Sequence, residues 1–299
     1  MIIKIRYIVQ VEVRLNNFGI VGQGFVGGAL REGMQHAFDV ETYDIDPNKP
    51  STVNSINELV DKVDKVVFVC LPTPMTRDGR CSTKIVEDAV SEINDVSRRL
   101  NKNMIVVIKS TIEPGTTERL NARYDDITVA FNPEFLTEAN AVEDFKNQTR
   151  IIVGAPRPAS SIVKNLFLKA FPKTPIIKTS STIAETVKYF TNCFLATKVS
   201  FANEMKQICD GMDIDYDKVV EYALYDNRIG NSHLAVPGPD GNLGFGGHCF
   251  PKDLNAIRFL SELLNVNPTV LNAVWEKNLE VRSEDDRDWL KMKGRAIVD

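Results

Sequence analysis

The stretch GIVGQGFVG, residues 19–27, decides the fold class of this chain of 299 residues. Its glycines Gly22, Gly24 and Gly27 follow an apolar run and precede a segment with helical spacing. In a strand–turn–helix unit the first glycine permits the tight turn, the second admits a pyrophosphate, and the third lets helix and strand pack closely. Asp44 ends the next apolar run, where a carboxylate can bind ribose hydroxyls and repel a 2′-phosphate. The stretch predicts an NAD-binding unit, and a glycine-rich turn with a surface aspartate is the alternative.

Short apolar runs alternate with amphipathic segments from residue 17 to about residue 180. This order predicts a Rossmann-type, doubly wound parallel sheet with helices on both faces and ligands at the carboxyl ends of the strands. Thr73 and Thr111 each follow such a run, so we expect them at the cofactor edge, although either could simply form a turn. The predicted strands cover residues 18–22, 38–44, 65–72, 104–110, 127–133, 150–155 and 174–179.

A long helix is predicted over residues 181–212, which hold no proline and whose apolar residues recur at helical spacing. Ser181 or Thr182 can cap its start. Such a helix spans roughly 45 Å, so we expect it to link two domains and to offer a dimer surface. Lys188 and Asn192 are four residues apart and share one face, which could be functional or merely a solvated stripe.

The chain is expected to divide into three parts. Residues 1–16 alternate like a strand and could add an edge strand, residues 17–180 form the NAD-binding domain, and residues 181–299 form a mostly helical domain for dimerisation and catalysis. Residues 283–295 are expected to form a solvated charged helix.

Composition excludes several classes of function. The net charge of −4 provides no basic footprint for nucleic acid, and no run of eighteen apolar residues could span a membrane. The five cysteines form no CxxC pair, which favours reduced thiols in a cytoplasm over a disulfide framework or a metal site.

The segment GFGGHCFPKD, residues 244–253, places one cysteine, Cys249, among three glycines. A thiolate is a nucleophile, and bare glycine backbone gives a substrate carbon access to it. A tight turn with an incidental cysteine is the alternative. His248 is adjacent to Cys249, and because neighbouring side chains generally point apart we do not expect a Cys–His pair.

Six ordered motifs make the chain from residue 17 onward resemble the UDP-glucose/GDP-mannose dehydrogenase family, and specifically its branch that oxidises UDP-glucose. The motif at residues 19–27 is shared with many dehydrogenases, whereas the motif at residues 244–253 is highly specific to this family. The motifs are GIVGQGFVG (19–27), LPTP (71–74), KSTIEPGTT (109–117), NPEFLTEANAVEDF (132–145), ETVKYFTNCFLATKVSFANE (185–204) and GFGGHCFPKD (244–253).

The resemblance implies a role for each matching residue. Cys249 is the expected nucleophile; Asp253 can orient Lys188 or accept a proton through water, and Glu138 or Thr111 can position that water. Arg228 is expected to reach the substrate of a partner subunit. The expected catalytic residues are Cys249, Lys188, Asn192, Asp253, Glu138 and Thr111. The expected cofactor contacts are Gly22, Gly24, Phe25, Val26, Gly27, Asp44, Lys49, Thr73, Thr111 and Glu138. The expected substrate contacts are Glu134, Phe135, Leu136, Lys188, Asn192, Arg228, Phe245 and Gly246.

The reaction that the resemblance implies is the four-electron oxidation of a nucleotide sugar by NAD, from UDP-glucose to UDP-glucuronate, through a thiohemiacetal and a thioester on Cys249. The expected assembly is a homodimer through the helix at 181–212. The family's third, nucleotide-binding domain has no match in this sequence, which bears on the expected affinity for substrate but leaves the expected catalytic residues untouched. Residues 235–243 are expected to add a loop before the cysteine motif. The alternatives are a beta-hydroxyacid dehydrogenase, which transfers one hydride, and a non-catalytic NAD-binding partner of a full-length relative.

Overall fold

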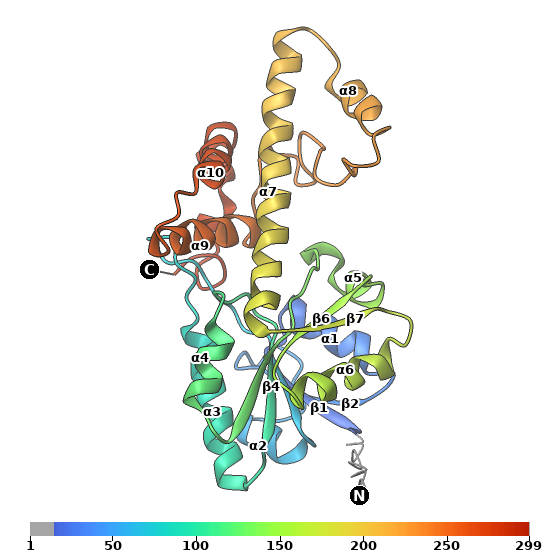
Figure 1. Cartoon of the computed structure of the whole chain (residues 1–299), viewed down its shortest axis with the longest axis vertical. Helices are drawn as coiled ribbons and strands as arrows, with labels where there is room; N and C mark the ends of the chain where they lie inside the picture. The colour runs from blue at the N-terminus through green and yellow to red at the C-terminus, as the bar shows by residue number, and fades with distance from the viewer. Residues whose placement is uncertain (1–14, 299) are drawn as a thin grey trace, which may run out of the picture.

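A computed structural model describes residues 15–298. Figure 1 shows a sheet domain from which the long helix α7 rises, with α9 and α10 on one side of it and α8 near its far end. The strands are β1 Asn17–Val21, β2 Asp39–Tyr43, β3 Val66–Val69, β4 Met104–Ile108, β5 Ile127–Phe131, β6 Ile151–Gly154 and β7 Ile176–Thr179. The α-helices are α1 Phe25–Met34, α2 Ile56–Lys62, α3 Lys84–Leu100, α4 Thr116–Arg123, α5 Ala141–Lys146, α6 Ala159–Ala170, α7 Ser181–Gly211, α8 Tyr216–Ala223, α9 Cys249–Leu263 and α10 Thr269–Val281. The short 3-10 helices are η1 Glu138–Asn140, η2 Glu284–Asp286 and η3 Asp288–Leu290.

The seven strands form one sheet in the order β2-β1-β3-β4-β5-β6-β7. The neighbours pair in parallel except for β5 and β6, which meet in antiparallel fashion through Phe131 and Gly154. The prediction of a parallel sheet is therefore wrong for this one pair. The connection from β5 to β6 carries only η1 and the six-residue α5, whereas a parallel return usually needs a longer crossover helix.

Both faces of the sheet are covered, which confirms the doubly wound architecture. One apolar core joins the sheet to α2, α3 and α4, and a second joins its other face to α1, α5 and α6. Strand β3 shows how the sequence does this: Val67 and Val69 enter the first core, whereas Val66 and Phe68 enter the second. Successive side chains of a strand point to opposite faces, so a strand buried on both faces reads as a continuous apolar run.

The long helix is confirmed almost residue for residue. Helix α7 covers Ser181–Gly211, but its N-cap is Ser180, whose hydroxyl oxygen accepts a hydrogen bond from the amide of Ile183 at 3.4 Å. Helices α9 and α10 pack on α7 around a small apolar cluster that includes Cys193, Leu254 and Val274. Within residues 15–298 no helix is both long and apolar enough to cross a bilayer.

Two expectations about the ends of the chain have different outcomes. The strand expected at residues 1–16 falls almost wholly outside the described residues and stays a prediction. The solvated helix expected at 283–295 is wrong, because the segment forms only η2 and η3. Trp289 is buried against Trp275, with ring centroids 5.8 Å apart, and this apolar anchor holds the segment against α10.

Candidate active site

Cys249 is the first residue of α9, directly after a loop rich in glycine. Gly244 and Gly247 have φ angles of +67° and +69°, a region that glycine adopts without strain. Removal from water raises the pKa of the partly exposed Cys249 thiol to about 12, although the nearby charge of Lys188 acts in the opposite direction. The thiol is therefore protonated near neutral pH.

Lys188 of α7 forms a buried ion pair with Glu134, which lies in the loop after β5. The ammonium donates to Glu134 Oε1 at 2.7 Å and to the Glu134 carbonyl oxygen at 2.8 Å. Burial opposes both charges, yet each partner outweighs it: the pKa of Glu134 is lowered and that of Lys188 is raised. Both groups are charged, and two of the three N–H bonds of Lys188 are in use.

Asp253, one turn into α9, lies between Asn192 and Lys252. The Asn192 amide donates to Asp253 Oδ2 at 2.6 Å, and the Lys252 ammonium pairs with Asp253 Oδ1. Burial lowers the pKa of Lys252, but Asp253 outweighs this effect and raises it overall. The direct carboxylate partner of Lys188 is Glu134, and the nearby charge of Asp253 also raises the pKa of Lys188, so the expectation that Asp253 orients Lys188 stays a prediction.

Thr73 and Thr111 lie close together, as their positions after β3 and β4 predict. The thiol of Cys81 contacts the carbonyl oxygen of Thr73 at 3.9 Å and that of Thr111 at 3.5 Å. Cys81 also interacts with the charges of Lys252 and Asp253. The two threonines thus lie on the side of the sheet that faces Cys249.

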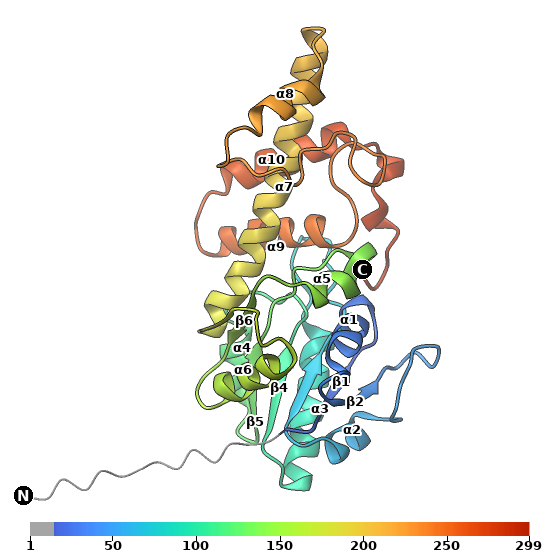
Figure 2. The ribbon, with the colours of Figure 1, turned by 90° about the vertical axis from the view of Figure 1, so that its right-hand side faces the viewer.

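Glu138 pairs with Arg295 at 2.7 Å and lies 3.4 Å from Nδ1 of His248. The His248 ring also packs edge-on against Phe25 of α1, with centroids 5.5 Å apart. In the view of Figure 2, the helices α1 and α5 of the sheet domain lie below α9. His248 therefore faces Glu138 and the glycine turn, as expected for a residue that does not form a Cys–His pair, and it joins the cofactor edge to the cysteine loop.

The glycine turn after β1 has the geometry that a dinucleotide needs. Gly22 has a φ of +95°, and a Cβ at Gly27 would lie 1.9 Å from the carbonyl oxygen of Gly22. A Cβ at Gly24 would meet nothing within 4 Å, which leaves room for a pyrophosphate beside the start of α1. Asp44 Oδ2 accepts from the amide of Gln23 at 2.6 Å, so its carboxylate lies at this turn.

The residues expected to bind the substrate lie in three places. Phe135 lies beneath Lys188, whose nitrogen is 5.7 Å from the ring centroid, and the amide of Leu136 donates to Glu134 Oε2 at 2.8 Å. Phe245 is buried and both of its backbone groups bind Asn278, so its expected contact with the substrate stays a prediction, as does that of Gly246. Arg228 is exposed and pairs with Asp226 in its own loop, so the structure does not join it to the rest of this site.

Comparison with known proteins identifies the family of this chain. Residues 52–171 match the NAD binding domain of the UDP-glucose/GDP-mannose dehydrogenase family, and residues 182–280 match its central domain. A UDP-glucose 6-dehydrogenase of Haloferax volcanii is 31% identical over 87% of this chain and 68% of that protein. The chain belongs to the UDP-glucose/GDP-mannose dehydrogenase family.

Further relatives in this family support the fold and the relationship. A UDP-glucose 6-dehydrogenase of Rickettsia typhi is 36% identical over 71% of this chain but only 48% of its own length. The structure of a UDP-glucose dehydrogenase from Pyrobaculum islandicum superposes with a TM-score of 0.80 at 30% identity, covering 90% of this chain and 69% of that one. The chain thus spans between about half and two thirds of the length of these relatives.

The family's cofactor fits the residues present. The open space at Gly24, the free first turn of α1, which carries no acidic residue, and the carboxylate of Asp44 together suit NAD. Lys49 is exposed beyond β2. Within residues 15–298 no three histidine, cysteine, aspartate or glutamate side chains gather to hold a metal ion.

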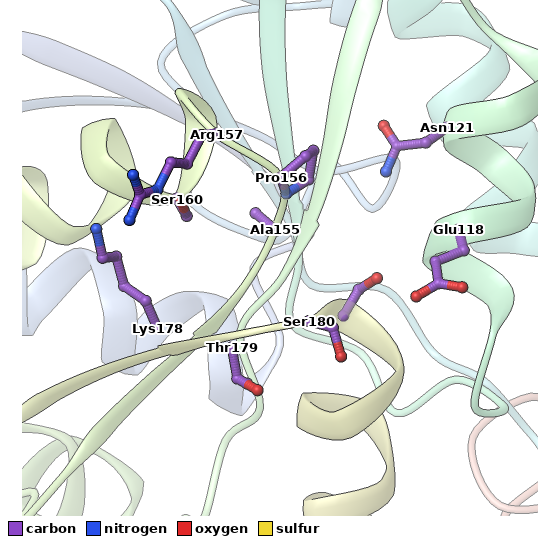
Figure 3. A pocket seen from close by; sticks show the side chains of 10 residues that line it. Glu118, Asn121, Ala155, Pro156, Arg157, Ser160, Lys178, Thr179 and Ser180 are labelled. Atoms are coloured by element: carbon purple, nitrogen blue, oxygen red, sulfur yellow. The ribbon is translucent and has the colours of Figure 1, made fainter.

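A cavity of about 550 Å³ lies elsewhere, between α4, α6 and the start of α7. Figure 3 shows Arg157 and Lys178 on one side of it and Glu118 on the other. None of the expected site residues lines it. Lys188 is seven residues along α7 from Ser181, which lines the cavity, so the cavity is about two helical turns from the dehydrogenase site.

Three buried polar residues near the site were missed by the sequence reasoning. Lys252 forms an ion pair with Asp253. The sequence signal that could have identified it is its position directly before Asp253 in the cysteine motif. Lys109 donates to Asn132 Oδ1 at 2.7 Å, and burial lowers its pKa to about 8. Its signal was a lysine directly after a fully buried strand. Asn278 of α10 bonds to the glycine-rich loop, and no local signal marks it.

Proposed function

We propose that this chain oxidises the primary alcohol of a nucleotide sugar to the acid, with UDP-glucose as substrate and UDP-glucuronate as product. One observation carries the proposal: a cysteine at the start of α9 lies close to the buried ammonium of Lys188, on the cofactor side of an NAD-binding sheet. Relatives named UDP-glucose 6-dehydrogenase support the choice of sugar. The five unpaired cysteines suit a cytoplasmic enzyme.

The site must stabilise negative charge on oxygen at each oxidation. NAD, when bound, accepts a hydride from the sugar carbon in each of the two steps. Lys188 has one N–H bond beyond those to Glu134, and this bond can be donated to the substrate oxygen. Asp253 keeps further lone pairs besides those used by Asn192 and Lys252, and can take up the alcohol proton through a water molecule.

Cys249 makes the second oxidation possible. Its sulfur bonds to the aldehyde carbon while the thiol proton passes to the aldehyde oxygen, which gives a thiohemiacetal. Loss of a hydride from carbon and of the hydroxyl proton leaves a thioester. Water then adds to the thioester, the carbon–sulfur bond breaks, the proton returns to sulfur, and the acid leaves. Gly247, two residues before Cys249, has open space where a Cβ would lie, which leaves room for the sugar carbon.

The active assembly in this proposal is a dimer through α7. Phe190 and Phe194 on α7 are 72% and 57% exposed, and their rings stack with centroids 6.4 Å apart. An exposed aromatic stripe of this kind is typical of a protein interface. A second copy could also bring the exposed Arg228 to the substrate of its neighbour.

The test is the total NADH formed per mole of UDP-glucose, with the product identified by mass. The proposal expects two NADH and UDP-glucuronate, and little free aldehyde. A beta-hydroxyacid dehydrogenase would give one NADH per mole of its substrate, and a non-catalytic NAD-binding partner would give none. Cys249→Ala should abolish the second oxidation, and complete double oxidation by this variant would overturn the mechanism.

A further inference from the structure

The glycine loop, residues 240–248, connects to α9 without forming a helix or a strand. Backbone N–H and C=O groups in such a segment must find partners outside regular secondary structure. Here several of them bind side chains that come from other helices. The loop ends immediately before Cys249, so whatever fixes the loop also fixes the start of α9.

Asn278 of α10 holds both backbone groups of Phe245. The Phe245 amide donates to Asn278 Oδ1 at 2.7 Å, and Asn278 Nδ2 donates to the Phe245 carbonyl oxygen at 3.1 Å. Asn278 is fully buried. A Cβ at Gly244 would lie 2.3 Å from Asn278 Oδ1, so the glycine is needed for this approach. The Gly244 amide itself donates to Asn203 of α7 at 3.1 Å.

The segment that follows α10 supplies two more residues that bind the loop. Arg282, whose side chain is 1% exposed, donates to the Leu243 carbonyl oxygen at 3.2 Å and pairs with Asp240 at 2.7 Å. The Gly247 amide donates to the carboxylate of Asp288 at 3.0 Å. Nearly every residue from 243 to 247 is therefore tied by a side chain from another part of the helical domain.

We propose that Asn278 is a positioning residue for the reaction of Cys249. Its side chain binds the backbone of the glycine loop and so holds the loop between α7 and α10. This contact sets where the thiol of Cys249 lies relative to Lys188, and it leaves the opposite side of the loop free for the sugar. The inference rests on the proposed function in one respect, since it assumes that Cys249 captures an aldehyde. Asn278 is fully buried and acts through the loop that it binds rather than on the substrate or the cofactor.

The amide of asparagine is the feature that matters, because it offers a donor and an acceptor to the two backbone groups of one residue, Phe245. Asn278→Asp keeps an acceptor for the Phe245 amide but loses the donor to its carbonyl oxygen, and Asn278→Ala loses both. Asn272→Ala is the matched control, since Asn272 lies on the same helix and accepts from Arg258 rather than from the loop.

The experiment measures two quantities in each variant of the 299-residue chain. The first is the rate at which iodoacetamide alkylates Cys249, followed by peptide mass. The second is the fraction of UDP-glucose released as free aldehyde. A loosened loop should raise the alkylation rate by about fivefold or more. Because a displacement of about 1 Å can cost about 100-fold in rate, aldehyde should escape and NADH per sugar should fall from two toward one.

The two readouts separate the two proposals. If the unmutated enzyme does not form two NADH, the proposed function fails, while the alkylation arm still tests the loop. Alkylation and aldehyde release within about twofold of the unmutated protein in the Asn278 variants would overturn the positioning role. Equal effects in Asn272→Ala would also overturn it. If Asn278→Ala does not fold, Asn278→Asp decides the matter by the same criteria.

Discussion

Replacing Lys188 with methionine should destabilise the protein far more than the loss of an ordinary surface charge. The side chains of Lys188 and Glu134 are 4% and 6% exposed, and the ammonium lies 2.7 Å from the carboxylate. Without Lys188, the carboxylate of Glu134 stays buried without its ionic partner. Breaking a buried pair in this way costs about 3–5 kcal/mol of unfolding free energy.

A second substitution separates the charge effect from lost packing. In Lys188→Met/Glu134→Gln the buried charge is gone. The Leu136 amide, which in the unmutated protein donates to Glu134 Oε2 at 2.8 Å, can still donate to the glutamine oxygen. We expect the double variant to recover at least about half of the lost stability. Oxidation of UDP-glucose should not recover, because the proposed mechanism uses this ammonium to stabilise the oxyanion.

The measurement is urea unfolding at pH 7.5, with the free energy extrapolated to zero denaturant. Lys206→Met is the control: Lys206 also lies on α7, but its pair with Asp210 is solvent-exposed, so its loss should cost at most about 1 kcal/mol. A cost below about 1 kcal/mol for Lys188→Met, or a double variant no more stable than the single one, would refute the reasoning.

The pH dependence of this effect has a definite sign. The folded pKa of Glu134 is lowered, so the stability it contributes is present above the ordinary pKa of a glutamate and is lost as the pH falls below it. Protonation of Glu134 also removes the buried negative charge that Lys188 neutralises. The gap between the unmutated protein and Lys188→Met should therefore narrow as the pH falls below about 4.5.

Three further predictions use other parts of the molecule. Asp44→Ala should weaken the binding of NAD and lower the ratio of kcat/KM for NAD to kcat/KM for NADP by about 10- to 100-fold. Similar kcat/KM values for the two cofactors in the unmutated protein would contradict the role of Asp44. Lys109 has a pKa lowered to about 8, so the folded state binds fewer protons than the unfolded state between about pH 8 and 10.5. The unmutated protein should gain up to about 3 kcal/mol relative to Lys109→Met as the pH rises from 7 to 10, and parallel stability curves in urea would contradict this. Mixed dimers of Arg228→Ala and Cys249→Ala chains should regain part of the activity that each lacks alone, and inactivity of verified mixed dimers would exclude a shared site.

The fold was predictable because its signals are local. The glycine turn and the buried runs specify β1, β3 and β4 through side-chain period and backbone freedom, and α7 follows from helical spacing over 31 residues. The antiparallel pairing of β6 was not predictable in this way. It depends on where η1 and α5 carry the chain between two strands, and the strand sequence of β6 would suit either direction.

The members of the candidate site were predictable, but their partners were not. The spacing of Lys188 and Asn192 placed both on one face of α7, and the structure brings that face to α9. Which carboxylate each one meets depends on tertiary packing: Lys188 binds Glu134 after β5, and Asn192 binds Asp253. Asn278 was invisible for the same reason, since it is 33 residues from the loop that it holds.

The charges around Cys249 decide how its thiol can react. Lys188 is balanced by Glu134, and Lys252 is balanced by Asp253, so these two ion pairs together add no net positive charge. A thiolate beside neutral pairs lacks a cation of its own, and removal from water then raises the pKa of the thiol to about 12. In the proposed mechanism Cys249 therefore attacks as a thiol that loses its proton as the carbon–sulfur bond forms. In the same proposal the remaining N–H bond of Lys188 serves the substrate oxygen, where negative charge develops, rather than a preformed thiolate.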